Sequence, residues 1–371
     1  MRIGIDGRAL QGARTGVGRY TYELCKRLDH LLQDAEFVVY SNVPVDISGL
    51  SNRWKLRLDT WALARHMKPV LWLKLRCGWL CRGDDLDVFW ATATFVPALA
   101  RSIRTVITVY DLTFMVAPDS MSRSHRWAFK LFFEKDVRRA DCVITISKGT
   151  SDRLFRLFGR RAALVVVPAV DFRFAPKAPE EIKACLDRHS ISPPYILSVA
   201  TWEPRKNIDV LIRAFLELKK SGLLSKHRLV LVGGRGWKDE RLAALIKNTG
   251  SEDILPLGFV LDDDLPSLYA GAELFVFPSL YEGYGIPVLE ARACRTRVVT
   301  TDSPELREAG GEEAVYVAPS PEGVRDGILF ALSRPKPAEA DAPCLATWEA
   351  GARELAAALV GTSDRVGSTT T

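Results

Sequence analysis

Short runs of apolar residues alternate along this chain with longer stretches in which apolar positions recur every three to four residues. The short runs predict buried strands, and the longer stretches predict helices with one apolar face. We expect strands at residues 3–6, 37–40, 88–90, 105–109, 143–146, 164–167, 196–199, 229–232, 274–277, 297–300 and 315–317. Alternating strands and helices are typical of parallel sheets with crossover helices, so the pattern predicts an α/β fold.

The length of 371 residues favours two domains rather than one. Five prolines between residues 168 and 194 surround one short predicted helix and indicate a connection between the domains. We therefore expect two Rossmann-like domains, at 1–175 and 176–345, whose parallel sheets face each other across a cleft. A helix is expected at about 346–360, followed by a polar, disordered tail at 361–371.

Composition limits the class of partner. The chain contains neither an apolar run of 18 residues nor a signal-peptide pattern, so we expect it to stay in the cytoplasm. Residues 1–175 carry a net charge of +11, which leaves −5 for the rest of the total of +6. A basic amino-terminal half favours an anionic partner such as a phospholipid, a lipid diphosphate or nucleic acid. No helix-turn-helix, zinc-finger or RNA-recognition signature is present, so we expect no nucleic-acid partner.

Residues 54–82 combine four of the nine tryptophans, at 54, 61, 72 and 79, with several Lys and Arg side chains and the single acid Asp59. That mixture suits an anionic membrane surface. The spacing also fits an ordinary helix whose Trp72, Leu75 and Trp79 turn into the core. The sequence leaves both interpretations open.

Metal ligands are not indicated. The seven cysteines form no Cys-x-x-Cys pair and no Cys/His cluster with the spacing of a zinc site, so we expect them to be reduced and mostly buried. Two Asp-x-Asp motifs, at 84–87 and 262–264, have a spacing that suits a divalent cation. The first lies at the entry end of a strand, and the second is expected to cap the helix that begins at Leu265. We therefore expect no metal site.

Glu282 and Glu290 stand on a predicted turn between a strand and a helix, where Pro287 suits the first helical turn. A helix N-terminus at the carboxyl end of a strand suits a diphosphate, and Gly283 and Gly285 let the backbone approach a ligand. Glu290 is placed to accept hydrogen bonds from ribose hydroxyls, and Glu282 lies nearer a reacting sugar. The segment predicts a nucleotide-sugar site.

Other polar residues follow predicted strands in the same way. Arg205 and Lys206 are placed to meet a diphosphate, because two fixed cations stabilise the charge that develops as a glycosidic bond breaks. Asp111 is either a turn cap or a group aimed at the sugar. Gly16 and Gly18 open a helix after the first strand, where backbone N–H groups would face the cleft, although a tight loop alone needs no ligand.

Together these segments resemble glycosyltransferase family 4, whose members are retaining enzymes with the GT-B fold. The resemblance covers nearly the whole chain, and its most specific part is the run EGYGIPVLE at 282–290. The other matching segments are IGIDGR at 3–8, TGVGRY at 15–20, VYDL at 109–112, AD at 140–141, IS at 146–147, EPRKN at 203–207, VGG at 232–234 and LGFV at 257–260.

The resemblance implies roles for individual residues. Glu290 would hold the ribose, Arg205 and Lys206 the diphosphate, and Glu282 the donor sugar, with Tyr110 and Asp111 near the transferred group. The further donor-binding positions that it implies are Gly16, Gly18, Gly258, Phe259, Val260, Gly283, Tyr284, Gly285, Ile286, Val288 and Leu289. Among these, Gly16 would close on the donor from the first domain, and residues 258–260 would border the base. The helix at about 346–360 would pack back on the first domain.

Two departures from the family pattern stand out. Tyr110 occupies a position where the family commonly has His, and Ala200-Thr201-Trp202 replaces a common Gly-Arg-Leu, so Arg205 is expected to supply the missing guanidinium. The resemblance, which is to bacterial surface-polysaccharide enzymes, implies transfer of a hexose to a growing or lipid-linked glycan without a metal or other cofactor. GDP-mannose is the first choice of donor. A nucleotide-sugar epimerase and a non-catalytic nucleotide-sugar-binding partner of another transferase are the alternatives.

Overall fold

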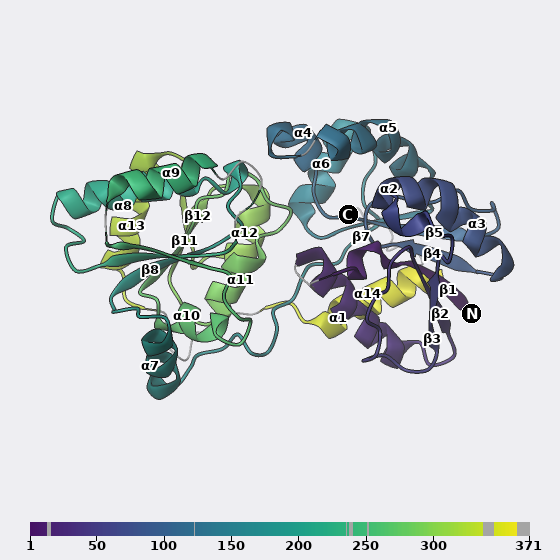
Figure 1. The fold of residues 1–371 in the computed structure, drawn as a ribbon, viewed down its shortest axis with the longest axis horizontal. Helices are drawn as coiled ribbons and strands as arrows, with labels where there is room; N and C mark the ends of the chain where they lie inside the picture. The colour runs from purple at the N-terminus through teal and green to yellow at the C-terminus, as the bar shows by residue number, and fades with distance from the viewer. Residues whose placement is uncertain are drawn as a thin grey trace, which may run out of the picture. The chain divides into compact units, whose positions relative to one another are not determined.

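The computed structural model describes residues 1–12, 16–121, 123–234, 236, 240–250, 252–336 and 345–361. The chain divides into two compact units (Figure 1). Unit 1 consists of Met1–Leu112, Arg123–Pro168 and the chain from Ala346 onward, and unit 2 of Thr113–Ser122 and Ala169–Leu345. Unit 2 therefore takes over at Ala169 rather than at residue 176, and it also includes a short segment at 113–122 that was expected in the first domain. Of the tail expected at 361–371, only Gly361 lies within the described residues.

Unit 1 is built on a seven-stranded sheet in which every neighbouring pair is parallel. The order across the sheet is β3 (Trp54–Leu58), β2 (Glu36–Ser41), β1 (Arg2–Asp6), β4 (Val88–Ala91), β5 (Arg104–Val109), β6 (Cys142–Thr145) and β7 (Leu164–Val165). The direction in which strands are added reverses between β1 and β4. In open parallel sheets, such a switch point is where the loops diverge and ligands bind.

Two helices from opposite ends of the chain pack together in unit 1. These are α1 (Gly16–Leu31) and the yellow α14 (Trp348–Val360) (Figure 1). The rings of Trp348 and Tyr20 meet edge to face at 5.8 Å, so the helix expected near 346–360 does pack within the first unit. The other helices of unit 1 are η1 (Gly7–Leu10), η2 (Ala64–His66), α2 (Pro69–Trp72), η3 (Leu73–Cys77), α3 (Gly78–Leu80), η4 (Cys81–Gly83), α5 (Arg123–Arg139) and α6 (Lys148–Phe158).

The segment 54–82 is neither one core helix nor one interfacial helix. It begins with β3 and continues through short helical pieces, among which η3 is a π-helical turn. Trp72 is fully buried as expected, but Leu75 and Trp79 are 63% and 56% exposed, so the prediction that all three enter the core is wrong. The π-turn inserts an extra residue, which rotates the following positions off the shared face. None of the described helices is both long and apolar enough to cross a membrane.

Unit 2 is built on a six-stranded sheet whose paired strands are also all parallel. The order is β10 (Ile254–Gly258), β9 (Arg228–Val232), β8 (Tyr195–Val199), β11 (Leu274–Phe277), β12 (Val298–Thr301) and β13 (Val315–Val317). The switch point lies between β8 and β11. The four residues of β11 are at most 1% exposed, as expected for a strand covered on both faces.

Helices cover both faces of this sheet (Figure 1). One face carries α8 (Ile208–Lys220), α9 (Glu240–Thr249) and α13 (Pro321–Ser333), and the other carries α7 (Pro179–Arg188), α10 (Leu265–Gly271) and α11 (Ile286–Ala293). The remaining helical segments of unit 2 are α12 (Pro304–Gly310), which packs against α11, η6 (Pro204–Lys206), α4 (Thr113–Val116) and η5 (Pro118–Ser120). The loops that leave β8 and β11 start side by side at the switch point, since the two strands are neighbours.

Candidate functional site

The structure brings three of the predicted site residues together at the switch point of unit 2. Arg205 and Lys206 lie in the turn η6 after β8, and Glu282 lies in the loop after β11. Lys206 Nζ is 2.6 Å from Oε1 of Glu282, and Arg205 Nη1 is 3.0 Å from Oε2 of the same carboxylate. One carboxylate therefore holds two cations, and we call these three residues the cation cluster.

Burial sets the electrostatics of the cation cluster. The side chains of Lys206 and Glu282 are each 11% exposed. Burial would raise the pKa of Glu282, but the nearby charges of Lys206 and Arg205 outweigh it and hold that pKa below its ordinary value. Burial also lowers the pKa of Lys206, which Arg205 lowers further and Glu282 opposes. Glu282 is thus firmly ionised, while each cation shares its counter-charge.

The backbone around the cluster is fixed by a second set of hydrogen bonds. Ser279 Oγ donates to Oε1 of Glu282 at 2.5 Å, and the Leu280 N–H donates to the carbonyl of Arg205 at 2.8 Å. Arg205 Nε also donates to Glu203 at 2.9 Å, so a second acid orients the guanidinium. Because these bonds link the two loops, the positions of the cations depend on both strands.

Gly233 joins the neighbouring loops on the same edge of the sheet. It follows β9 at a φ of +131°, and a Cβ there would lie 2.0 Å from the carbonyl oxygen of Ala200. Its N–H donates to the carbonyl of Gly258 at 2.7 Å. The carboxyl ends of β8, β9 and β10 are therefore packed closely enough that only glycine fits at this point.

Glu290 lies on α11 and is 7% exposed. The hydroxyl of Tyr269 donates to Oε2 of Glu290 at 3.0 Å, which fixes the carboxylate. Gly285 precedes the helix at a φ of +109°, and a Cβ there would lie 2.7 Å from Leu306, which explains the glycine. Pro287 occupies the first turn, as the sequence predicted.

The remaining donor-binding positions fall into two groups. Tyr284, Val288, Leu289 and Val260 have buried side chains, and the amides of Val288 and Leu289 donate to the carbonyl of Gly285 at 2.9 and 3.2 Å. Phe259, in contrast, is 74% exposed beside Gly258, which has a φ of +68°. Gly283 and Ile286 lie on the turn between Glu282 and α11. The side chains and amides of Val288 and Leu289 are therefore used within the fold, whereas Phe259 offers an exposed ring.

In unit 1, the predicted positions near the sugar serve packing as well. The ring of Tyr110 meets that of Tyr20 edge to face at 5.5 Å, and its hydroxyl lies 3.2 Å from the hydroxyl of Thr21. Burial raises the pKa of Tyr110. Asp111 follows it after β5. Gly18 lies where a Cβ would be 2.8 Å from the carbonyl oxygen of Ala9, whereas a Cβ at Gly16 would meet nothing within 4 Å among the described residues.

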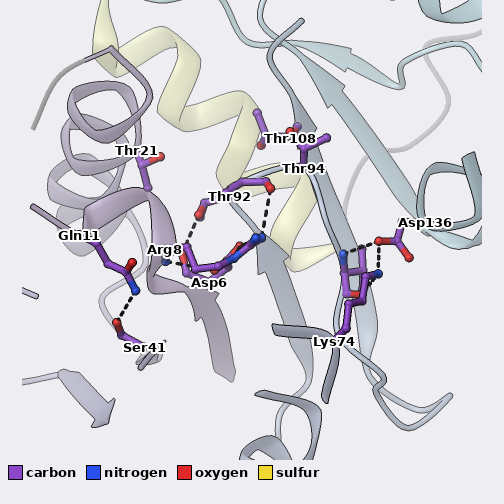
Figure 2. A network of polar contacts seen from close by, with 12 residues as sticks. Asp6, Arg8, Gln11, Thr21, Ser41, Lys74, Thr92, Thr94, Thr108 and Asp136 are labelled. Atoms are coloured by element: carbon purple, nitrogen blue, oxygen red, sulfur yellow. Dashed lines mark hydrogen bonds and ion pairs between the residues drawn. The ribbon is translucent and has the colours of Figure 1, made fainter. Parts of the chain in front are cut away.

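Sequence reasoning missed a polar network at the switch point of unit 1 (Figure 2). Asp6, at the end of β1, pairs with Arg8 at 2.6 Å, and Arg8 also donates to the carbonyl of Ala93 after β4 at 3.1 Å. Lys74, in the π-turn, pairs with Asp136 of α5 and donates to the carbonyl of Val96 at 2.8 Å. Asp6 and Arg8 are close in sequence, but Lys74 and Asp136 are 62 positions apart, so only the position of Asp6 at a strand end could have indicated the network.

The first acidic motif, at 84–87, lies at the entry end of β4, as predicted. Asp84 accepts from the hydroxyl of Tyr40 at 2.7 Å. Asp264 precedes α10, but its side chain makes no capping hydrogen bond, so the predicted cap is wrong. It instead accepts from Arg188 and lies beside His189 at the end of α7. Cys185 also lies beside them, so three possible metal ligands meet in space although their spacing in the sequence did not indicate it. The described cysteines are free and buried, as expected.

Two family models match the chain. The model described as "Glycosyl transferase 4-like domain" matches residues 15–169, and that described as "Glycosyl transferases group 1" matches residues 188–341. The chain belongs to this glycosyltransferase family. The family-4 resemblance of the sequence is thereby confirmed, and a transferase is favoured over an epimerase or a non-catalytic partner.

Individual glycosyltransferases agree with this assignment. The chain is 29% identical over 321 residues to O-antigen chain mannosyltransferase B of Escherichia coli, and the match spans 82% of this chain and 84% of that protein. It is 26% identical over 284 residues to O-antigen chain mannosyltransferase RfbU of Salmonella typhimurium, spanning 76% and 72%. Sucrose-phosphate synthase from Thermosynechococcus elongatus has a similar structure, with a TM-score of 0.70, 17% identity and coverage of 96% of this chain and 94% of that one. This likeness confirms the GT-B fold.

Proposed function

We propose that this glycosyltransferase moves a hexose, with retention of configuration and without a metal, from a nucleoside-diphosphate sugar to a growing or lipid-linked bacterial glycan. The observation that carries the proposal is the cation cluster. Two cations lie beside the loop that leads into α11, where a diphosphate would meet the positive end of the helix. Unit 2 would bind the donor, and unit 1 the acceptor.

The cluster suits the charge changes of the transfer. When the bond between the sugar C1 and the diphosphate oxygen breaks, the electron pair passes to the diphosphate. Arg205 and Lys206 would stabilise that added charge in place of a metal ion. The acceptor hydroxyl oxygen then bonds to C1, and its proton passes to the departing phosphate. Glu282 acts here as the positioning residue that keeps both cations at the donor site.

The other donor contacts follow from the same placement. Glu290, already oriented by Tyr269, would accept hydrogen bonds from the ribose. The exposed ring of Phe259, beside Gly258 and Val260, would border the base. Mannose from GDP-mannose is the proposed donor, because two relatives whose matches span 82% and 76% of this chain are named as mannosyltransferases.

A thermal-shift panel tests the proposal directly. The full chain is heated with GDP, UDP, ADP or dTDP, and with their common sugars, in the presence of EDTA. A ligand that binds only the folded state raises the melting temperature, so GDP and GDP-mannose are expected to do so. If a nucleotide stabilises the protein only when metal is added, donor binding is not metal-independent. A rise in melting temperature with UDP alone would contradict the proposal that the donor carries guanine. No shift at all in a folded protein would contradict the donor site.

We also propose that unit 1 contacts an anionic membrane surface through residues 61–79. Trp61 and Trp79 flank the guanidinium of Arg76, each with its ring centroid 4.9 Å away. Both rings are about half exposed, and Leu63, Leu71 and Leu75 are exposed in the same segment. Exposed Trp rings favour the headgroup region of a bilayer. Arg76 is itself paired with Asp59 at 2.9 Å, so the exposed Arg65 and Lys68 of the segment would meet the anionic lipids. A lipid-linked acceptor would be presented there, on the inner face of the cell membrane.

Vesicle sedimentation tests this surface. The chain is expected to sediment with vesicles that contain anionic lipid at low salt, and less so as the salt concentration rises. Trp79→Ser with Leu75→Ser should reduce the bound fraction, whereas substitution of the exposed Phe172, outside this segment, should not. Absence of binding at low salt would overturn this part of the proposal without affecting the donor site.

A further inference from the structure

Three side chains with different metal-binding atoms converge in unit 2. They are Cys185 at the end of α7, His189 just after it, and Asp264 just before α10. One ligand atom from each, namely the thiol sulfur, a ring nitrogen and a carboxylate oxygen, lies within 4.8 Å of the other two. The group shares no residue with the cation cluster.

The backbone explains why these atoms meet. Cys185 and His189 are four residues apart, so the end of α7 presents them on the same side. Asp264 comes from a separate segment, the turn between β10 and α10, and α7 packs against α10. Cys185 is fully buried, while the side chains of His189 and Asp264 are 22% and 15% exposed. The cluster thus has a closed side at the sulfur and a partly open side at the imidazole.

Hydrogen bonds already orient the three side chains toward one another. The Cys185 thiol donates to the backbone carbonyl of Asp264 at 3.6 Å, and His189 Nε2 lies 2.9 Å from Oδ2 of Asp264. Arg188 donates to the other oxygen, Oδ1, at 2.5 Å. The two carboxylate oxygens therefore have different partners, and Oδ2 is the one that faces the imidazole.

A carboxylate that binds a metal often uses one oxygen for the metal and accepts a hydrogen bond with the other. Metal-binding side chains are usually oriented by a hydrogen bond from a neighbouring group, and Arg188 already supplies one to Asp264. A tetrahedral zinc ion takes sulfur at about 2.3 Å and nitrogen or oxygen at about 2.0 to 2.2 Å, which places its ligand atoms about 3 to 4 Å apart. The observed spacing is compatible with that geometry after small side-chain movements.

We propose that Cys185, His189 and Asp264 bind one Zn²⁺, or a divalent cation of similar chemistry, with water as the fourth ligand. The Cys185 thiol loses its proton to solvent on binding, and the neutral imidazole binds through Nε2. The thiolate and the carboxylate together balance the two charges of the ion, and Arg188 stays on Oδ1. The ion would join α7 to the turn before α10, so its role is structural rather than catalytic.

Cobalt spectroscopy on the full chain tests this site. The reduced protein is treated with a chelator, transferred to metal-free buffer and titrated with Co²⁺. Thiolate bound to Co²⁺ is expected to give a charge-transfer band in the near ultraviolet, together with the visible bands of a tetrahedral ion. The signal should saturate at one Co²⁺ per chain and disappear when Zn²⁺ is added. A folded protein that gives no band overturns the proposal.

Matched variants separate this site from other thiols. Cys185→Ser should abolish the near-ultraviolet band, and His189→Gln should weaken Co²⁺ binding at least about 100-fold. Cys142→Ser removes another buried cysteine and should leave the band unchanged. Arg188→Gln removes only the orienting group, so the band should persist at reduced affinity. Zn²⁺ should raise the melting temperature of the unaltered chain but not of Cys185→Ser. Retention of the band in Cys185→Ser overturns the assignment.

Discussion

Within the described residues, Glu282 is the one acid that forms an ion pair with Lys206, at 2.6 Å, and it also binds Arg205 at 3.0 Å. The three charged groups of the cation cluster therefore differ in the number of ion-pair partners that they have. Removing either cation leaves Glu282 with one partner, whereas removing Glu282 leaves Lys206 without this counter-charge and Arg205 with Glu203. Stability and catalysis should respond differently to changes at the two ends of this contact.

The first prediction concerns this asymmetry. Glu282→Gln should lower the free energy of unfolding by about 3 kcal/mol, because it leaves a buried ammonium uncompensated. Lys206→Met should cost less stability, since burial already disfavours the charged ammonium and lowers its pKa. Lys206→Met should nevertheless lower kcat/KM about 100-fold or more, because it removes a cation from the departing diphosphate. Denaturant unfolding and a transfer assay with GDP-mannose measure the two effects.

A matched control makes this prediction specific. Lys220→Met removes an exposed lysine at the end of α8 and should change neither quantity. Full transfer activity in Lys206→Met would contradict the role of the cation cluster. A larger loss of stability in Lys206→Met than in Glu282→Gln would contradict the shared-carboxylate argument.

Sequence patterns located most of the strands because parallel strands are buried on both faces and read as apolar runs. The sequence patterns did not predict two edge strands, for two different reasons. Strand β3 (Trp54–Leu58) alternates apolar and basic residues, and several of its positions are exposed. It therefore lacks the apolar run by which the other strands were predicted. Strand β10 (Ile254–Gly258) contains Pro256, which is tolerated at an edge but argues against a strand in the sequence.

The sequence placed Glu282, Arg205 and Lys206 at strand ends, and that position is sufficient to bring them to one edge of a sheet. It did not show that the three would pair, because pairing depends on β8 and β11 being neighbours. The contact between Lys74 and Asp136 could not be predicted from the sequence for a similar reason. Those residues come from a short π-turn and a long helix, and neither element has a motif.

The second prediction concerns the glycine that joins the loops of unit 2. Gly233→Ala should lower the free energy of unfolding by more than about 3 kcal/mol, because the new Cβ would collide with the backbone of Ala200 and the positive φ adds strain. Gly222→Ala is the matched control. Gly222 also has a positive φ, +78°, but apart from its chain neighbours no atom of the described residues lies within 4 Å of its Cβ position, so only about 1 kcal/mol is expected. Equal losses in the two variants would contradict the close packing of the loops.

The third prediction concerns Tyr110, whose hydroxyl lies 3.2 Å from that of Thr21. Tyr110→Phe keeps the ring against Tyr20 and removes one buried hydrogen bond, so it should cost about 1 kcal/mol of stability. We expect its kcat/KM to stay within about threefold of the unaltered enzyme, whereas Asp111→Asn should reduce it far more. A large loss of kcat with normal stability in Tyr110→Phe would instead assign the hydroxyl to the reaction.

The last prediction concerns pH and the network of unit 1 (Figure 2). Burial lowers the pKa of Lys74 from 10.5 to about 8, against the opposing effect of Asp136. Below about pH 8 the ammonium is charged in both states, and its burial cost is fully present. Between pH 8 and 10.5 the folded state releases this proton while the unfolded chain keeps it, so this residue's contribution to stability rises by about 3 kcal/mol. The unfolding free energy of Lys74→Met should therefore fall relative to the unaltered chain as the pH rises through this range. Lys183→Met, which removes an exposed lysine, should show no such divergence, and parallel pH profiles for all three proteins would contradict the lowered pKa.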